Sequence, residues 1–378
     1  MRQILIGARL FDGQRLHGTQ AVVVDGGRVV ATLPEADAPP GKRLRLEGGV
    51  LAPGLIDLQV NGGGGRMVDG SATADVLAEI CAAHARLGAT GILPTLITDT
   101  PEATAAVIRA GIEAARRNVP GFLGLHLEGP HLDPRRKGAH DPRLIRPMDQ
   151  TDLERLCDAA RQLPALMVTL APVAASAEQI KALRAAGAIV SLGHAEATSD
   201  EARQAIAAGA NCATHLFNAM SQLGNREPGM VGTILTESIP AGLIADSIHV
   251  HPAAMRIAMA ASPQSLFLVS DAMCVAGSDL TEFTLGGRRI LRRQGRLTLE
   301  DGTLAGADLT LPDAIHCLIT EVGVAPEIAL AMATSRPARI IAAQARAGSI
   351  GPGRLADLVH LTDDWRLGQV WQGGQTLL

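Results

Sequence analysis

The chain has 378 residues, of which 47% are hydrophobic and 19% charged, and its formal net charge is −4. This length allows one large domain with an appendage, or two domains, and the composition excludes general disorder. With 2% aromatic residues and no tyrosine, the chain also lacks the basic field and the stacking platforms that nucleic-acid binders use.

The cysteines and the first residues bear on the compartment. The five cysteines are scattered and form no C-x-x-C pair, which is typical of buried thiols in a reducing compartment. The start, "MRQILIGARLFDG", turns polar too soon for a signal peptide, and no apolar run is long enough to span a membrane. We therefore predict a cytoplasmic protein with no nucleic-acid or membrane partner.

The two ends of the chain share a β-rich pattern. Residues 1–52 contain apolar runs such as "QILIGARLF" and "AVVVDGGRVVATL", separated by glycine-rich turns, and residues 346–378 return to this style. We predict a small β-sandwich domain built from residues 1–52 and 346–378, and a second domain of residues 53–345.

Between these ends, short apolar runs alternate with alanine-rich segments of helical period, such as "ADVLAEICAAHARLG" and "SDEARQAIAAG". The runs lie near residues 55–60, 89–95, 121–127, 165–171, 188–193, 210–215, 242–247 and 266–270. Eight strands alternating with helices over about 220 residues predict an α/β fold, the (β/α)₈ TIM barrel. A doubly wound sheet is disfavoured because no G-x-G-x-x-G opens a helix after a strand. We also predict an inserted hairpin at "TEFTLGGRRILRRQGRLTLEDG" and helices from about 309 to 345.

Polar residues follow the ends of several predicted strands. They are His126, Glu128, His194, His215, Asn218, Asp246, His249 and Asp271. A single histidine after an apolar run is more often structural, and Asp271 alone could cap a helix. In a barrel, however, the carboxyl ends of the strands meet at one mouth. Because buried charges without partners are costly, their joint placement indicates a functional site.

Three of these residues suit a catalytic metal. Glu128, His194 and His215 supply three nitrogen and oxygen donors, and catalytic zinc sites use three protein ligands while one position stays open. Such an ion lowers the pKa of water to about 7, and Asp271 is the remaining strand-end carboxylate that can take its proton. We predict one divalent ion per subunit, with zinc favoured by this ligand set.

Longer motifs resemble a known family. "PGLIDLQVNGGGG", "HLEGPH", "KGAHDP", "SLGHAEAT", "ATHLFNAMSQL", "REPGMVG", "DSIHVHP", "LVSDAM", "GTLAGA", "SRPAR" and "GPGRLADLVHL" occur in this order. Over nearly its whole length the sequence resembles the N-acetylglucosamine-6-phosphate deacetylase family of the amidohydrolase superfamily. The resemblance implies a barrel with a small β-sandwich, usually a homodimer. It also implies metal-dependent hydrolysis of the acetamide of a phosphorylated amino sugar, giving glucosamine 6-phosphate and acetate.

The resemblance also implies roles for residues. Glu128, His194 and His215 would hold the metal, and Asp271 would act first as general base and then as general acid. The implied substrate contacts are Ala139, His140, Asn218, Ala219, Arg226, His249, Leu304, Ala305 and Gly306. Family members with an H-x-H pair bind two metals and those with Gln-x-Asn bind one.

Four more positions are compared with the family pattern. Gln59 and Asn61 place this chain with the single-metal members. His126 is expected to support the site from behind. At position 131 the family often has an aromatic residue, whereas this chain has His131. The resemblance therefore does not determine the shape of the pocket wall at that point.

Two other functions fit the sequence less well. A dihydroorotase-type amidohydrolase needs a carbamylated lysine on the fourth strand, where "PALMVTLAPV" has Thr169 instead. A non-catalytic scaffold predicts loss of Asp271 or of the histidines, and all are present. The galactosamine epimer stays open as a substrate, because it differs by one hydroxyl. Whether Arg226 serves its own subunit or a neighbouring one is also open.

Overall fold

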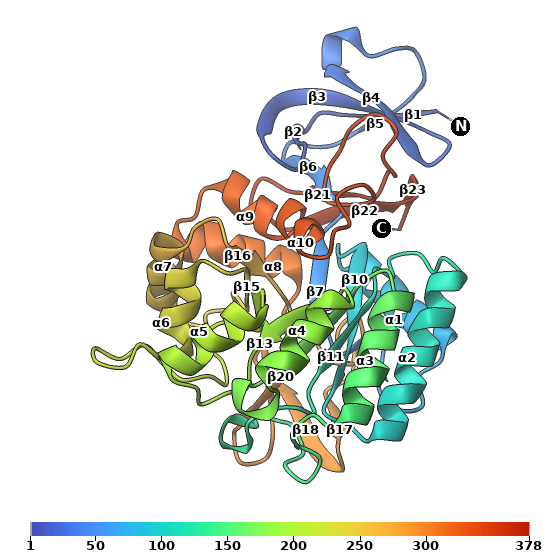
Figure 1. The fold of residues 1–378 in the computed structure, drawn as a ribbon. Coiled ribbons are helices and arrows are strands. Elements are labelled where there is room, and N and C mark those ends of the chain that lie inside the picture. The colour runs from blue at the N-terminus through green and yellow to red at the C-terminus, as the bar shows by residue number, and fades with distance from the viewer. Residues whose placement is uncertain (1, 378) are drawn as a thin grey trace.

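The structure is a computed structural model and describes residues 2–377. Within these residues, eight parallel strands form one sheet in the order β16-β15-β14-β13-β12-β11-β10-β7. They are β7 (Ile56–Val60), β10 (Gly91–Ile97), β11 (Leu125–Glu128), β12 (Leu166–Leu170), β13 (Ile189–Leu192), β14 (Cys212–Ala213), β15 (Ala241–Leu243) and β16 (Leu266–Leu268). A parallel bridge between Val60 and Ala272 nearly closes the sheet into a barrel. The predicted (β/α)₈ barrel is confirmed (Figure 1).

Helices cover the outside of the barrel (Figure 1). They are α1 (Ala74–Arg86), α2 (Pro101–Arg116), α3 (Gln150–Gln162), α4 (Ala177–Ala185), α5 (Ser199–Ala208), α6 (Gly229–Glu237), α7 (Pro252–Ala261), α8 (Leu311–Cys317), α9 (Pro326–Met332) and α10 (Ser335–Ile340). The predicted segment "SDEARQAIAAG" is α5. Thr198 and Glu201 form a capping box at its start, and Gly209 ends it with φ of 122°, a conformation that glycine adopts without strain.

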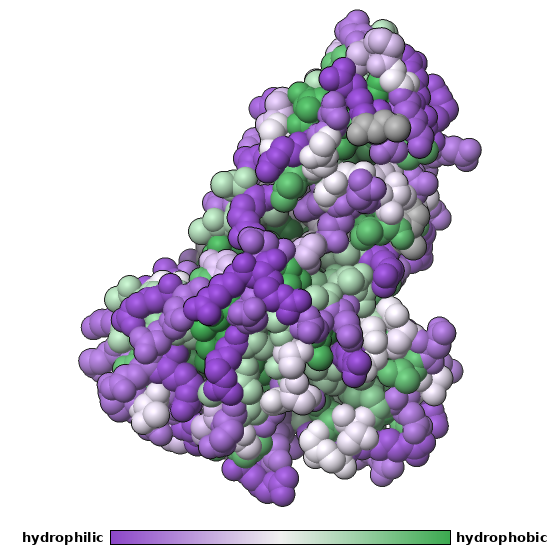
Figure 2. Space-filling view, turned by 90° about the vertical axis from the view of Figure 1, so that its right-hand side faces the viewer, coloured by the Kyte–Doolittle hydropathy of each residue, from purple (hydrophilic) through white to green (hydrophobic). Residues whose placement is uncertain are grey.

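A second sheet combines both ends of the chain, and in Figure 2 it forms a lobe above the barrel. Its strands are β1 (Gln3–Ile6), β2 (Arg9–Phe11), β3 (Leu16–Asp25), β4 (Arg28–Pro34), β5 (Lys42–Arg45), β6 (Val50–Pro53), β21 (Leu358–Leu361), β22 (Leu367–Gln372) and β23 (Gln375–Thr376). Strand β6 pairs with both β2 and β21, so it joins the two terminal segments. The exact domain boundaries, residues 52/53 and 345/346, stay predictions.

The predicted inserted hairpin is also present and is followed by one more strand. Strands β17 (Glu282–Leu285), β18 (Arg288–Arg293), β19 (Arg296–Thr298) and β20 (Leu304–Ala307) pair antiparallel in chain order. A small apolar cluster that includes Leu285, Ile290 and Met273 packs this sheet against Ala139. The insertion therefore lies beside the segment that follows β16 and borders the barrel mouth. Short strands β8 (Gly62–Gly63) and β9 (Arg66–Met67) pair nearby.

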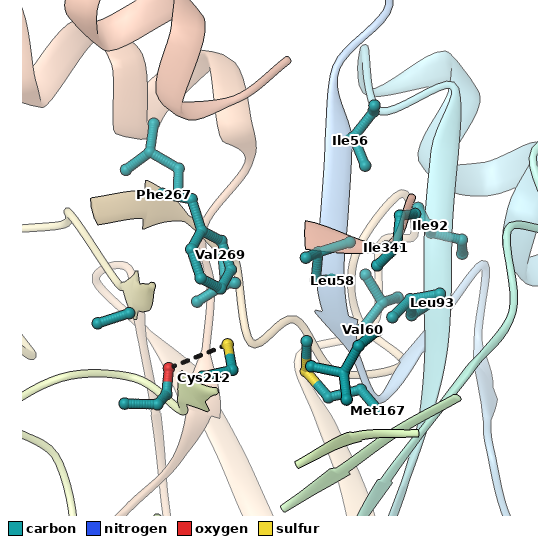
Figure 3. Close-up of a cluster of buried hydrophobic side chains, with 14 of the residues drawn as sticks. Ile56, Leu58, Val60, Ile92, Leu93, Met167, Cys212, Phe267, Val269 and Ile341 are labelled. Atoms are coloured by element: carbon teal, nitrogen blue, oxygen red, sulfur yellow. Dashed lines mark hydrogen bonds between the residues drawn. The ribbon is translucent and has the colours of Figure 1, made fainter. Parts of the chain in front are cut away.

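Strand β7 illustrates how the barrel is stabilised and how it carries polar groups. Ile56, Leu58 and Val60 belong to the main apolar cluster, where Figure 3 shows them with residues of β10, β12 and β14. Because neighbouring residues of a strand point to opposite faces, the alternate residues Asp57 and Gln59 face the other side. Both are nearly fully buried as well. One face of β7 thus adds to the core and the other brings polar side chains into the barrel.

The outer surface is mainly hydrophilic, with scattered hydrophobic residues (Figure 2). In the described part of the chain, no helix combines the length and the hydropathy needed to cross a membrane. All five cysteines lie within the described residues and are buried free thiols, as the sequence predicted.

Candidate active site

A cavity of about 250 Å³ opens at the carboxyl ends of the barrel strands. Its lining residues are Asn61, Ile97, Glu128, Gly138, Ala139, His140, His194, His215, Asn218, Ala219, Ile244, His249, Asp271, Met273, Thr303, Leu304 and Gly306. They come from the ends of most barrel strands and from the inserted sheet. Catalytic groups of TIM-barrel enzymes lie at this end of the strands.

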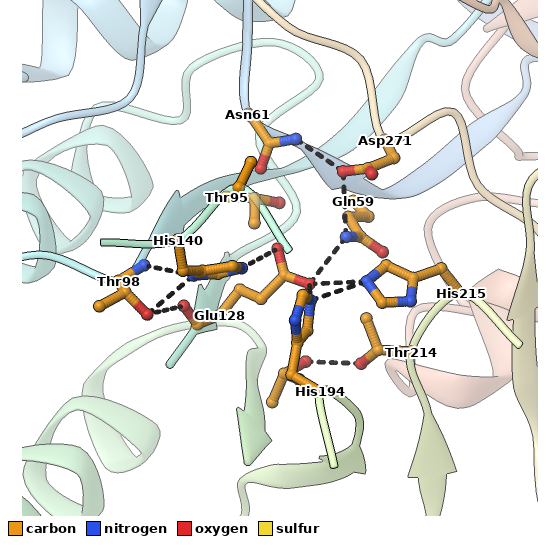
Figure 4. Close-up of polar contacts among 12 residues, drawn as sticks. Gln59, Asn61, Thr95, Thr98, Glu128, His140, His194, Thr214, His215 and Asp271 are labelled. Carbon is orange, nitrogen blue, oxygen red and sulfur yellow. Dashed lines mark hydrogen bonds and ion pairs between the residues drawn. The ribbon is translucent and has the colours of Figure 1, made fainter. Parts of the chain in front are cut away.

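The three predicted metal ligands converge in this cavity (Figure 4). Glu128 Oε1 lies 3.2 Å from the Nε2 atoms of both His194 and His215, and these two nitrogens are 3.0 Å apart. Ligand atoms about 2.0–2.2 Å from one ion lie roughly 3 Å from one another. The spacing therefore matches the ligand shell of a single small cation.

Hydrogen bonds also fit a cation at this point. Nδ1 of His194 lies 2.9 Å from the carbonyl oxygen of Arg136. A carbonyl only accepts, so this Nδ1 carries the proton and the Nε2 lone pair faces the Glu128 carboxylate. A lone pair beside an anionic oxygen is unfavourable unless positive charge lies between them. The residues present thus fit a divalent metal, and the observed donor set supports one.

The pKa values of Glu128 and His215 depend on each other. Burial alone would raise the pKa of Glu128, but the neighbouring imidazoles of His194 and His215 hold this pKa well below its usual value. Burial alone would lower the pKa of His215, and the Glu128 carboxylate raises it instead. Glu128 therefore stays anionic, as a metal ligand must.

Asp271 lies near these ligands and is held by the amide of Gln59 on β7 and by that of Asn61, which directly follows this strand. Gln59 Nε2 and Asn61 Nδ2 donate to Asp271 Oδ1 over 3.1 and 2.7 Å, and Gln59 Nε2 also lies 3.1 Å from Glu128 Oε1. Burial and the Glu128 charge raise the pKa of Asp271 to about 6. In the described chain no helix begins between Asp271 and α8, so the capping role that the sequence left open is excluded.

The backbone at these positions is strained. His194, His215 and Asp271 have φ values of 47°, 26° and 52°. Residues other than glycine rarely adopt this left-handed region, and such strain concentrates at functional sites. Each of the three comes soon after a barrel strand, and the turn directs its side chain into the mouth. No sequence signal predicts this conformation for histidine.

The residues predicted to contact the sugar phosphate divide into two groups. Those that line the cavity are Ala139, His140, Asn218, Ala219, His249, Leu304 and Gly306. Ala305 does not line it, because it is fully buried in the small cluster beneath the inserted sheet. Arg226 is exposed on the loop before α6 and is also outside the lining.

Two histidines of the cavity wall have defined tautomers. The backbone N–H of Thr98 donates to Nδ1 of His140 over 3.2 Å, so the proton of neutral His140 is on Nε2, which lies 4.0 Å from Glu128 Oε2. Burial and the nearby His194 lower the pKa of His140 to about 3, so it stays neutral. Nδ1 of His249 is 2.6 Å from Asp246 Oδ2. His140 thus presents a donor to the cavity, and Asp246 orients His249.

His126 and His131 are placed behind the site. His126 is fully buried and contacts the hydroxyl of Thr169 over 2.7 Å, and burial lowers its pKa to about 4. His131 is buried too, and its Nδ1 lies 3.2 Å from the carbonyl oxygen of Arg146. Neither residue lines the cavity. The departure at His131 therefore does not change the pocket wall.

Sequence reasoning missed two kinds of residue here. Thr303 and Gly138 line the cavity, but both lie in loops without a periodic signal. Arg288 of β18 donates to the carbonyl oxygen of Ala139 and so holds the loop that carries His140. The sequence offered only a cluster of arginines in a predicted hairpin, which is more often a solvated face.

Comparison with known proteins agrees with this geometry. The Amidohydrolase family model matches residues 50–375. The chain belongs to the amidohydrolase family. It is 42% identical over 344 residues to N-acetylgalactosamine-6-phosphate deacetylase of Shewanella sp. (strain ANA-3), covering 90% of this chain and 86% of that protein. It is 32% identical over 371 residues to N-acetylglucosamine-6-phosphate deacetylase of Haemophilus influenzae, covering 97% of both.

Solved structures agree as well. N-acetylglucosamine-6-phosphate deacetylase from Pasteurella multocida superposes with a TM-score of 0.95 at 33% identity, covering 100% of this chain and 99% of that one. The family resemblance, the barrel fold and the hydrolase class predicted from the sequence are thereby confirmed.

Proposed function

We propose that the protein hydrolyses the acetamide of N-acetylglucosamine 6-phosphate to glucosamine 6-phosphate and acetate. The observation that carries this proposal is the convergence of Glu128, His194 and His215 on one point of a buried cavity, with Asp271 facing them. Family members of this kind, at 32% to 42% identity over most of the chain, act on N-acetylated amino-sugar phosphates according to their names.

Asp271 is the proton carrier in this proposal. The amides of Gln59 and Asn61 donate to its Oδ1, which leaves Oδ2 available to take a proton from the attacking water. The same oxygen then returns the proton to the sugar nitrogen, because an amine leaves poorly from a tetrahedral carbon without protonation. Gln59 and Asn61 are positioning residues, since they orient the carboxylate and touch neither substrate nor water in this scheme.

Glu128, His194 and His215 would hold one divalent ion, and we propose zinc, which prefers such nitrogen and oxygen donors. The ion supplies positive charge that polarises the acetamide carbonyl and lowers the pKa of a water molecule. Gln59 and Asn61 stand where an H-x-H pair would, and neutral amides are poor zinc ligands. Elemental analysis of protein purified without chelator is expected to give one equivalent per chain, and two retained equivalents would contradict the single-metal site.

The sugar is proposed to lie between His140 and the turn at Asn218 and Ala219. Nε2–H of His140 can donate to a ring hydroxyl, and His249, oriented by Asp246, can donate to the phosphate when protonated. The phosphate is the only charged group of this substrate, so an unphosphorylated sugar would lose its main anchor. We expect the 6-phosphate to raise kcat/KM by orders of magnitude over free N-acetylglucosamine.

Arg226 bears on subunit organisation. It is exposed and outside its own cavity, on a loop that stands away from the barrel (Figure 1). Leu223 on the same loop is 56% exposed and Ile257 on α7, the helix that follows His249, is 57% exposed. We propose a homodimer in which this loop packs on the partner and brings Arg226 to the partner's phosphate site. Light scattering after gel filtration tests it, and a monomer with full activity contradicts it.

The second candidate function is deacetylation of the galactosamine epimer, because the relative at 42% identity is named N-acetylgalactosamine-6-phosphate deacetylase. An acetate-release assay over N-acetylglucosamine, N-acetylgalactosamine and their 6-phosphates decides between the two. Preference for either 6-phosphate supports a deacetylase of amino-sugar phosphates, and turnover of neither contradicts it. We propose the cytoplasm as the place of action, in keeping with five free thiols.

A further inference from the structure

A second cavity lies at the opposite end of the barrel and has no part in the proposed reaction. Its volume is about 300 Å³. Asn211 directly precedes β14, Pro240 precedes β15 and Ser265 precedes β16, so these loops form its floor at the amino ends of three successive strands. Helix α10 supplies the remaining wall with Arg336 and Arg339. The active site lies at the carboxyl ends of the same strands.

The guanidinium of Arg336 is buried without a negative partner. Its residue is only 8% exposed, and its one hydrogen bond within the described residues runs from Nη1 to the carbonyl oxygen of Leu266 over 2.7 Å. Burial and, to a smaller extent, the charge of Arg339 together lower the pKa of Arg336 to about 10. Arginine is rarely buried unless it is paired, because an uncompensated buried charge is destabilising.

A structural role alone does not explain this arrangement. One hydrogen bond to a carbonyl requires a donor but no charge, and a neutral amide would supply it. Instead, two positive charges line one cavity, and its lining includes no aspartate or glutamate.

The remaining polar groups are also suited to an anion. Asn211 Oδ1 already accepts from the backbone N–H of Val190 over 3.1 Å, so its amide N–H groups are left for the cavity. Gln264 adds a further amide. The free hydrogen-bonding capacity of the lining is therefore largely that of donors.

We infer that this cavity binds a small phosphate-bearing anion between Arg336 and Arg339. One guanidinium group can donate two parallel hydrogen bonds to two oxygens of a phosphate. A phosphate monoester carries close to two negative charges at neutral pH, which matches the charge of the two arginines. The volume accommodates either inorganic phosphate or the phosphate of a small phosphorylated metabolite. Because the site is remote from Asp271, the inference does not depend on the deacetylase reaction.

Binding is tested with the full-length, metal-loaded protein carrying Arg226→Ala and His249→Ala, which removes the phosphate contacts proposed for the active site. Inorganic phosphate and glucose 6-phosphate are titrated separately by calorimetry and by thermal unfolding, against sodium chloride at equal ionic strength. We expect saturable binding and a rise in Tm with at least one of them. Tighter binding of glucose 6-phosphate would identify a phosphorylated metabolite, and equal or tighter binding of inorganic phosphate would identify the free ion.

Two further substitutions in that background locate the site. Arg339→Gln is expected to weaken phosphate binding by about tenfold or more, as loss of a charged hydrogen-bonding partner does. The matched control is Arg116→Gln, because Arg116 is also an exposed arginine in the last turn of a helix and is outside this cavity. Arg336→Gln keeps a donor for Leu266 and should abolish binding, and without phosphate it should unfold at the same or a higher temperature.

Two outcomes would overturn the inference. One is a phosphate response no greater than that of sodium chloride. The other is equal binding by Arg339→Gln and Arg116→Gln. Arg339 is exposed, so its substitution decides the matter even if Arg336→Gln does not fold.

Discussion

The two faces of β7 differ in the side chains that they bury: one face is apolar and the other is polar. Leu58 and Val60 lie in the main apolar cluster, whereas Gln59 and Asn61, the residue directly after the strand, are equally buried but hold Asp271 and face the metal ligands. Burial of the apolar face stabilises the fold. Burial of the polar face raises the pKa of Asp271 and leaves Asn61 Oδ1 without a hydrogen-bond partner in the described structure. The apolar face of the strand thus stabilises the fold. The polar face serves the proposed reaction, and burying its polar groups costs stability.

The largest effect is expected on the polar side. Asp271→Asn removes the group that carries the proton but keeps its size, so kcat should fall by about 1,000-fold or more, with KM and metal content little changed. Steady-state kinetics with elemental analysis of the variant give the answer. Near-normal turnover in a variant with full metal content would remove Asp271 from the mechanism and break the comparison between the two faces.

The matching change on the apolar face is Leu58→Ala. Leu58 is 1% exposed, and truncation of a buried leucine lowers the free energy of unfolding by about 2–5 kcal/mol through lost burial and the cavity left behind. We expect kcat of the folded fraction to stay within about twofold of the original. Denaturant unfolding and active-site titration measure both quantities. A large fall in kcat without a loss of stability would show that the two faces are not separable.

A smaller effect is expected at the exposed loop. Arg226→Ala removes a guanidinium proposed to bind phosphate in ground and transition states alike, so KM for the 6-phosphate should rise about 10- to 100-fold while kcat changes little. Arg203→Ala, on exposed helix α5, serves as the control for loss of surface charge. An unchanged KM contradicts the assignment. Mixing the Arg226→Ala and Asp271→Asn variants should restore part of the activity if Arg226 acts across subunits.

The most gradual effect, spread over several pH units, concerns Asp57. Burial raises the pKa of Asp57 from 3.8 to about 7. The folded state therefore keeps a proton that the unfolded state releases, and the stabilising contribution, complete below 3.8, is lost as the pH rises toward about 7. In this window the free energy of unfolding should fall by at most about 1.4 kcal/mol per pH unit. In urea unfolding, the free energy of unfolding of Asp57→Asn should depend less on pH. An unchanged dependence on pH would assign the effect to other groups.

Much of the fold followed from local patterns. The period-two and period-3.6 distributions of apolar residues located the barrel strands, and capping residues such as Thr198 with Gly209 marked helix ends. The convergence of Glu128, His194, His215 and Asp271 was also predictable, because the carboxyl ends of parallel barrel strands meet at one mouth. The roles assigned to these residues stay predictions that the variants above test.

The tertiary structure alone decided the rest. It buried Ala305 beneath the inserted sheet, moved His131 away from the pocket, and placed Arg226 outside its own cavity. These outcomes depend on contacts between residues far apart in the chain. The sequence by itself determined which residues stand at strand ends, since that depends on the strand repeat. Distances, tautomers and the left-handed backbone of His194 were set only when separate strands and loops packed together, because each reflects a balance of neighbours that no local pattern encodes.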